Sequence, residues 1–279
     1  MEQLTGFIKK VTKIIAKPEM RVLPGQLAFF FVLSLIPLIA LLGAIASKFS
    51  ISVNEIQELM AVSLPPSIYE LLQTVIANNT LNFNIIVFFI SAFILASNGT
   101  HSMIITSNEI YKIESNNYIK RRLKAIGMTL ILVGVLLFII LIPVFGDTIF
   151  KTIKIYSNNQ VLVNIIYTLY QILKYPVSVL VIYLNIKVLY ILAPDRKIRA
   201  STTTKGALFT TISWVLSTEI YTFYIGRLAT YDVFYGSISN IIILLLWIYI
   251  LSYIFVLGMA FNAGVTKEED IERTGVILK

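Results

Sequence analysis

Six blocks of apolar residues, separated by polar stretches, make up most of the chain. Each block has about twenty residues, which at 1.5 Å per residue is enough for a helix to cross a hydrocarbon core of about 30 Å. The apolar runs are continuous and do not alternate with a period of two, so helices are predicted rather than barrel strands. The predicted spans are Gln26 to Ser47, Phe83 to Ile105, Ile126 to Gly146, Tyr175 to Ala193, Gly206 to Ile225 and Ser237 to Ala263.

The composition is that of a membrane protein. Hydrophobic residues make up 57% of the 279 residues and charged residues only 14%, whereas an average soluble domain has roughly 25% charged residues. A water-soluble fold could not remove so much apolar surface from water. We therefore expect an all-α integral membrane protein with about six transmembrane helices.

The basic residues are divided unevenly between the two sides of the predicted helices. One side carries 17 lysine and arginine residues, in the N-terminal segment, the second and fourth connections and the tail, and the other side carries five. Because cytoplasmic loops are enriched in lysine and arginine, the side with 17 is predicted to be cytoplasmic. Six spans then return both termini to the cytoplasm.

Three regions follow from this topology: a basic N-terminal segment over residues 1–25, a six-helix transmembrane domain over 26–263 and a charged cytoplasmic tail over 264–279. In the N-terminal segment, apolar residues recur at helical spacing with lysines on the opposite face. This pattern predicts an amphipathic helix bound to anionic phospholipid headgroups, with a solvated arm as the alternative. The external connections, Phe49 to Asn82 and Asp147 to Lys174, are expected to form short amphipathic helices.

The residue types present exclude several kinds of chemistry. The chain has no cysteine and a single histidine, His101, so thiolate and multi-histidine metal sites are excluded. It has no nucleotide-binding GxxxxGK[ST] loop, no HExxH and no GxSxG motif. We therefore expect no cofactor, no metal, no nucleic-acid partner and no enzymatic activity.

Two ionisable side chains, Lys187 and Glu219, lie inside predicted spans. Such groups are unfavourable at membrane depth unless they face protein or water, so a substrate or ion path is one interpretation. Counted from the span ends, they lie about 8 Å apart in depth, so a helix-packing ion pair is a second interpretation. Snorkelling of Lys187 toward the headgroups is a third. The candidate path residues are Asn185, Lys187, Glu219, Arg227, Tyr235, Gly236 and Ser237.

Several stretches also carry a family likeness. They are LAFFFVLSLIPLIALL, SNEIYKI followed by KRRLKAIGMTLIL, YILAPDRKIR, and YDVFYGSISNIIILLLWIYILSYIFVLGMAFNAG, in order from about Pro24 to Gly264. They resemble the YihY/virulence factor BrkB family, whose members have carried the label ribonuclease BN, which looks like a misassignment. The resemblance implies a six-helix, multi-pass protein of the bacterial cytoplasmic (inner) membrane. This chain departs from it at Ser239-Asn240, where relatives often read Gly-Ala.

The leading functional hypothesis is a membrane transporter or lipid-translocating protein with a path among the fourth, fifth and sixth spans. Transport would be secondary or passive, because the chain has no nucleotide motif. The first alternative is an envelope-assembly scaffold that uses the external loops as its contact surface. The second is a membrane-bound enzyme acting on a lipid or RNA, although Glu109, Glu114 and Asp195 are too dispersed in sequence to suggest a paired-metal site. The substrate, coupling ion and oligomeric state stay open.

Overall fold

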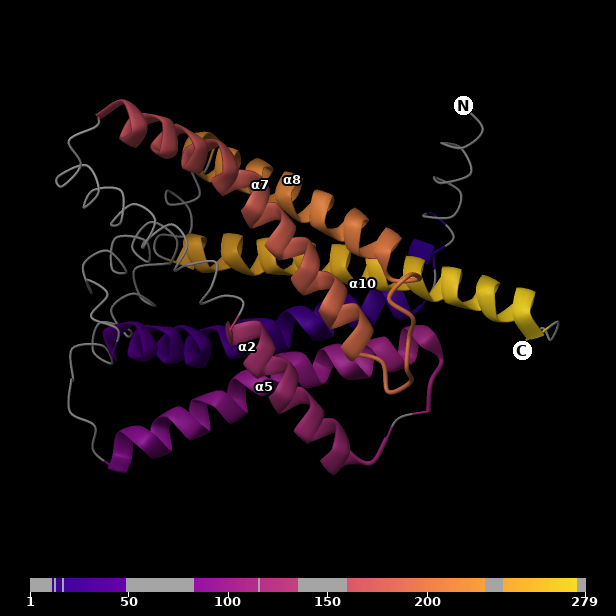
Figure 1. The fold of residues 1–279 in the computed structure, drawn as a ribbon. Coiled ribbons are helices and arrows are strands. Elements are labelled where there is room, and N and C mark those ends of the chain that lie inside the picture. The colour runs from indigo at the N-terminus through magenta and orange to yellow at the C-terminus, as the bar shows by residue number, and fades with distance from the viewer. Residues whose placement is uncertain are drawn as a thin grey trace.

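The computed structural model describes residues 12, 14–16, 18–48, 83–114, 116–134, 160–228 and 238–274. All regular secondary structure in this part of the chain is helical, as the apolar blocks predict (Figure 1). Most of the predicted N-terminal amphipathic segment and the whole first external connection lie outside the described residues. The helices are α2 (Glu19–Lys48), α5 (Phe83–Tyr111), a helix over residues 118–134, α7 (Gln160–Leu192), α8 (Thr204–Leu228) and α10 (Ile238–Thr274).

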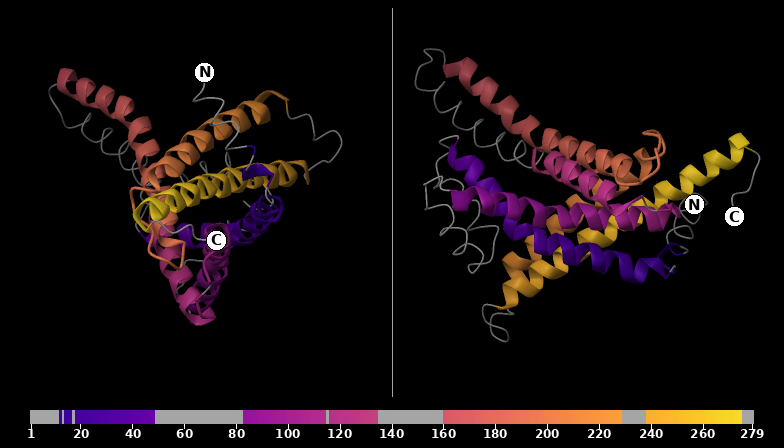
Figure 2. Two further views of the ribbon diagram at one scale, coloured as in Figure 1. Left: turned by 90° about the vertical axis from the view of Figure 1, so that its right-hand side faces the viewer. Right: turned by 90° about the horizontal axis from the view of Figure 1, so that it is seen from below.

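Helix α10 lies at the centre of the arrangement. It packs against α8, α2 and α5, while α2 packs along α5 and α7 packs on α8. Figure 1 and the left view of Figure 2 show α10 between the α2–α5 pair and the α7–α8 pair. The buried core contains apolar side chains from α5, α7 and α10, among them Met103, Tyr190, Phe255 and Met259, each at most 1% exposed. This core joins both helix pairs to α10.

Helix α5 ends where Lys112 adopts a left-handed backbone conformation, with a φ of 54°. The N–H of Ile113 donates to the carbonyl of Asn108 at 2.9 Å, which is the hydrogen bond that closes a Schellman motif. Lys112 Nζ contacts carboxylate oxygens of Glu19 at 2.7 Å and Glu109 at 2.9 Å. Hydrogen bonds to Glu19 and Glu109 raise the pKa of Lys112. The end of α5 is thereby joined to the start of α2.

Helices α7 and α10 extend furthest beyond the apolar blocks that predict them. Residues 160–174, expected in an external connection, are the first turns of α7, and α10 continues past the predicted span end at Ala263 to Thr274. Helix α7 also passes through Pro176 without ending. Membrane helices tolerate proline because neighbouring groups satisfy the backbone carbonyl that the ring leaves free.

The outer faces of the helices are apolar. Large apolar side chains such as Ile172 on α7, Ile220 on α8 and Leu246 on α10 are each more than half exposed. Within the described residues, two segments are long and apolar enough to cross a membrane: Asn164–Leu192 with 29 residues and Ile242–Val265 with 24. An apolar surface of this extent is unfavourable in water and favourable against lipid chains.

Candidate functional site

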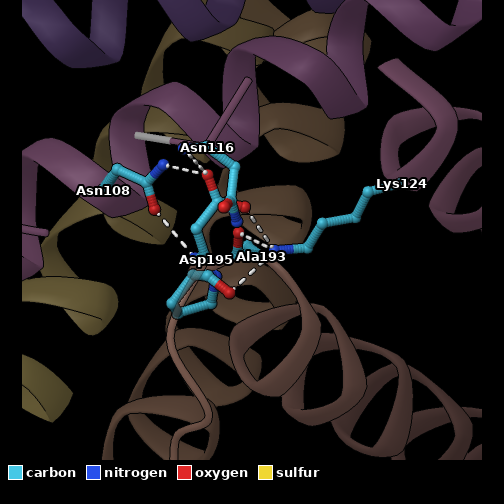
Figure 3. A network of polar contacts seen from close by, with 6 residues as sticks. Asn108, Asn116, Lys124, Ala193 and Asp195 are labelled. Atoms are coloured by element: carbon cyan, nitrogen blue, oxygen red, sulfur yellow. Dashed lines mark hydrogen bonds and ion pairs between the residues drawn. The ribbon is translucent and has the colours of Figure 1, made fainter. Parts of the chain in front are cut away.

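A buried carboxylate lies at the end of the molecule where α5 and α7 finish. Asp195, in the connection between α7 and α8, has a side chain that is only 2% exposed. Its Oδ2 accepts hydrogen bonds from Asn108 Nδ2 at 2.7 Å and from the backbone N–H of Asn116 at 3.1 Å (Figure 3). Its Oδ1 contacts Lys124 Nζ at 3.0 Å. We call Asn108, Asn116, Lys124 and Asp195 the Asp195 cluster.

Two further sets of hydrogen bonds stabilise this cluster. The backbone N–H of Asp195 donates to Asn108 Oδ1 at 2.9 Å, so these two residues exchange a pair of hydrogen bonds. Lys124 Nζ also donates to the carbonyl oxygens of Ala193 at 2.9 Å and Pro194 at 2.7 Å. These carbonyls follow the end of α7, where backbone acceptors lack helical partners and a cation is favourable. The cluster therefore joins α5 and the helix over residues 118–134 to the end of α7.

The charge state of Asp195 follows from its surroundings. Burial alone raises its pKa. The hydrogen bonds from Asn116, Lys124 and Asn108, together with the positive charge of Lys124, outweigh burial and hold the pKa of Asp195 below its ordinary value. The carboxylate is therefore ionised at neutral pH and paired with the ammonium group of Lys124.

The cluster unites three of the stretches that carry the family resemblance. Asn108 comes from SNEIYKI, Lys124 from KRRLKAIGMTLIL and Asp195 from YILAPDRKIR. Asp195 is 87 positions from Asn108 and 71 from Lys124. Sequence reasoning missed the cluster, since it treated Lys124 only as part of the basic count and Asp195 only as an isolated carboxylate. The available signal was that all three stretches lie on the same predicted side of the membrane.

Next to this end of the molecule, α8 and α10 approach each other at two glycines. A methyl group on Gly206 would overlap the carbonyl of Gly258, and one on Gly258 would overlap the Thr210 and Tyr190 hydroxyl groups. The Tyr190 hydroxyl lies 2.7 Å from Thr210 Oγ1 and donates to the carbonyl of Phe255 at 2.7 Å. This half of the helix interface is tightly packed, and the Tyr190 and Thr210 hydroxyl groups are bonded to each other within it.

The structure does not bring Lys187 and Glu219 together. Lys187 Nζ lies 5.8 Å from the centre of the Tyr183 ring, and Glu219 Oε1 accepts a hydrogen bond from the Tyr175 hydroxyl at 2.8 Å. Lys187 follows Tyr175 by twelve residues, or about 18 Å along α7. The ion-pair interpretation of Lys187 and Glu219 is therefore wrong. Asn185 is half-buried near Lys187 on the same helix.

The remaining candidate path residues are only partly described. Arg227 belongs to α8, but its side chain is not among those that the structure describes. Tyr235, Gly236 and Ser237 lie outside the described residues. Their role in a path stays a prediction.

Glu219 lies on an exposed surface that mixes polar and apolar side chains. Thr218, Glu219, Ile220 and Thr222 are all exposed on α8, and the exposed Tyr175 of α7 donates a hydrogen bond to Glu219. We call these five residues the Glu219 surface. In both views of Figure 2 the first turns of α7 extend away from the other described helices. The described side chains around Tyr175 and Glu219 are mostly exposed.

The architecture and its exposed apolar faces define an α-helical membrane protein. The chain belongs to the virulence factor BrkB family, whose model matches residues 15–276. The ribonuclease-like protein YfkH of Bacillus subtilis is 28% identical, over 95% of this chain and 97% of its own length. A UPF0761 membrane protein of Vibrio parahaemolyticus is 25% identical, over 95% of this chain and 83% of its own length. No solved structure matches the chain.

The comparisons agree with the family resemblance drawn from the sequence, and the relatives named as membrane proteins agree with the exposed apolar faces. They assign no role to the Asp195 cluster or the Glu219 surface. In the ranges that the structure describes, no group of three or more histidine, aspartate or glutamate side chains is placed to hold a metal ion.

Proposed function

We propose that the protein moves a lipid or another amphiphilic molecule across the bacterial cytoplasmic membrane, by secondary or passive transport. The observation that supports this most directly is the exposed carboxylate of Glu219 among exposed apolar side chains of α8. A charged group at membrane depth is unfavourable unless water or a polar partner accompanies it. The Tyr175 hydroxyl supplies one hydrogen bond to Glu219, and a path that admits water or lipid headgroups along the Glu219 surface would supply the remaining solvation of this carboxylate.

The difference in packing between the two halves of the molecule also supports a path. Tyr190 and Thr210 are at most 1% exposed, and the Asp195 cluster joins the helices beside them. Around Tyr175 and Glu219, by contrast, the side chains are exposed. The proposed path is therefore closed near the Asp195 cluster and open near Glu219, as expected for one state of an alternating-access protein.

The proposal includes a membrane topology. With six spans and both termini in the cytoplasm, the Asp195 cluster faces the cytoplasm and the Glu219 surface lies in the outer half of the membrane. The support is the excess of basic residues on one side of the predicted spans. The basic N-terminal segment would then rest on anionic phospholipid headgroups of the inner leaflet.

A lipid-translocation assay tests the proposal. The purified protein is reconstituted into liposomes that carry a fluorescent phospholipid in both leaflets, and a membrane-impermeant reductant then bleaches the outer leaflet. Wild-type protein should make the inner-leaflet lipid accessible, and Glu219→Gln should slow this exchange by about tenfold, the effect of losing one charge-assisted contact.

Glu114→Gln is the matched control, because it removes an exposed carboxylate outside the predicted spans. It should leave the exchange rate unchanged. Wild-type vesicles that exchange lipid no faster than protein-free vesicles would contradict the proposal for that lipid class. An unaltered rate in Glu219→Gln would remove Glu219 from the path.

Ribonuclease activity is the second candidate, because one relative is named a ribonuclease-like protein. It is tested by incubating the purified protein with RNA and a series of divalent cations. RNA cleavage by wild type that is lost in Glu109→Ala would favour the enzyme. Glu109 contacts Lys112 at 2.9 Å in an exposed ion pair, which is worth little stability, so this variant should fold.

A further inference from the structure

A second group of nitrogen-bearing side chains lies where the helix over residues 118–134 meets α5. The rings of His101 and Tyr118 make an edge contact, with their centres 5.8 Å apart. The guanidinium groups of Arg121 and Arg122 both lie close enough to act electrostatically on His101. We call His101, Arg121 and Arg122 the arginine site. It shares no residue with the Asp195 cluster or the Glu219 surface.

Arg122 is fixed in position by neutral acceptors. Its Nη1 donates to Asn98 Oδ1 at 2.8 Å, and its Nη2 donates to the carbonyl of Ile94 at 2.8 Å. Neither acceptor carries a negative charge. The guanidinium group is therefore held against α5 while its positive charge stays available to a further partner.

Arg121 and His101 each have a nitrogen without a partner in the described residues. Arg121 Nε and His101 Nε2 both lie beneath the surface and form no hydrogen bond there. The acidic group that acts on His101 is Asp195, and that carboxylate is already bound by Lys124. The N–H at Arg121 Nε is a buried donor without an acceptor, which is unfavourable. An anionic acceptor would therefore improve both the hydrogen bonding and the charge balance of this site.

The chemistry of the site and the surface beside it indicate which anion fits. The planar fork of an arginine side chain matches the oxygen atoms of a phosphate group. Tyr118, Ile119 and Leu123 on the same helix are each more than half exposed. A free phosphate ion gains nothing from this apolar surface, whereas the glycerol and acyl portions of a phospholipid would cover it.

We propose that His101, Arg121 and Arg122 bind the phosphate group of an anionic phospholipid, with Ile119 and Leu123 against its acyl chains. Tyr118, beside His101, suits the headgroup level, where tyrosine is enriched in membrane proteins. The basic stretch over residues 120–124 places the site in the cytoplasmic leaflet in the proposed topology. Binding at this site does not require that the protein translocate lipid.

The test is a titration of the purified full chain in detergent with dihexanoyl phosphatidylglycerol, followed by calorimetry. Wild type should bind this lipid, and Arg121→Gln should weaken binding by at least about tenfold, since a charge-assisted contact is lost. Lys120→Gln is the matched control: it removes the same charge from an exposed position one residue away and should bind as wild type does.

If Arg121→Gln and Lys120→Gln weakened lipid binding equally, binding would result from general electrostatic attraction to a basic surface, and the proposal would be overturned. Inorganic phosphate that binds as tightly as the lipid would assign the site to a free anion and overturn the lipid assignment.

A second variant, Arg121→Lys, keeps the charge but lacks the planar fork. It should unfold at the wild-type temperature without lipid and still bind the lipid more weakly, and wild-type affinity in this variant would contradict the proposal.

Discussion

The side chain of Asp195 contacts donors from two other segments of the chain, the α5 region and the helix over residues 118–134. Asp195→Asn would leave Lys124 facing a neutral amide and would turn one acceptor into a donor. Because the carboxylate is 2% exposed, we expect a loss of about 2 kcal/mol in the free energy of unfolding at pH 7. Thermal unfolding in detergent measures this loss.

The same residue predicts a dependence on pH. The folded-state pKa of Asp195 lies below its ordinary value, which is about 3.9. Its contribution to stability is therefore complete above the ordinary pKa and is lost as the pH falls through the folded-state pKa. The gap between wild type and Asp195→Asn should be constant from pH 7 to about pH 5 and should shrink at lower pH. A gap that grows on acidification would contradict the paired carboxylate.

Sequence reasoning was weakest for contacts between individual side chains. It identified Lys187 and Glu219 as unusual residues, and one of its three interpretations paired them with each other, because depth along a helix was the only coordinate it had. The structure instead bonds Glu219 to Tyr175. Which side chain faces which depends on how each helix is rotated and tilted against its neighbours. Apolar block boundaries carry no information about that rotation.

At the scale of helices, the crossing of α8 and α10 depends on small residues. A methyl group at Gly258 would overlap hydroxyl groups of Tyr190 and Thr210, and such overpacking costs about 1–3 kcal/mol. Gly258→Ala should therefore lower the unfolding temperature in detergent. Gly127→Ala is the control, because no atom lies within 4 Å of the added methyl group. It should be neutral or stabilising by up to about 1 kcal/mol, the gain in helix propensity.

The existence of the helices could be predicted from the sequence, and their lengths could not. Residues 160–174 were expected in an external connection because that connection mixes aliphatic residues with Asn, Ser and Thr. The structure makes them the first turns of α7. The end of a membrane helix depends on capping contacts and on the helices packed beside it, as at Lys112, where α5 ends. Polar residues within the apolar pattern indicate such ends only approximately.

At the scale of the whole molecule, the proposed topology predicts opposite exposure at the two ends of α7. Ser201 is exposed in the connection after α7, near Asp195, and Val161 is exposed at the start of α7. Helix α7 rises about 47 Å between Val161 and its end at Leu192, more than the hydrocarbon core of about 30 Å. The natural chain contains no cysteine, so Ser201→Cys and Val161→Cys each introduce a single labelling site.

In spheroplasts, a membrane-impermeant maleimide should label Val161→Cys at once and should label Ser201→Cys only after the membrane is permeabilised. The physical reason is that the connection with Ser201 carries Arg196, Lys197 and Arg199, and short loops rich in arginine and lysine are retained in the cytoplasm. The double variant labelled after permeabilisation shows that both sites react. Labelling of Ser201→Cys in intact spheroplasts would show that the topology is the reverse of the one proposed. The arginine site would then lie in the outer leaflet. Equal labelling of both variants would mean that α7 does not cross the membrane.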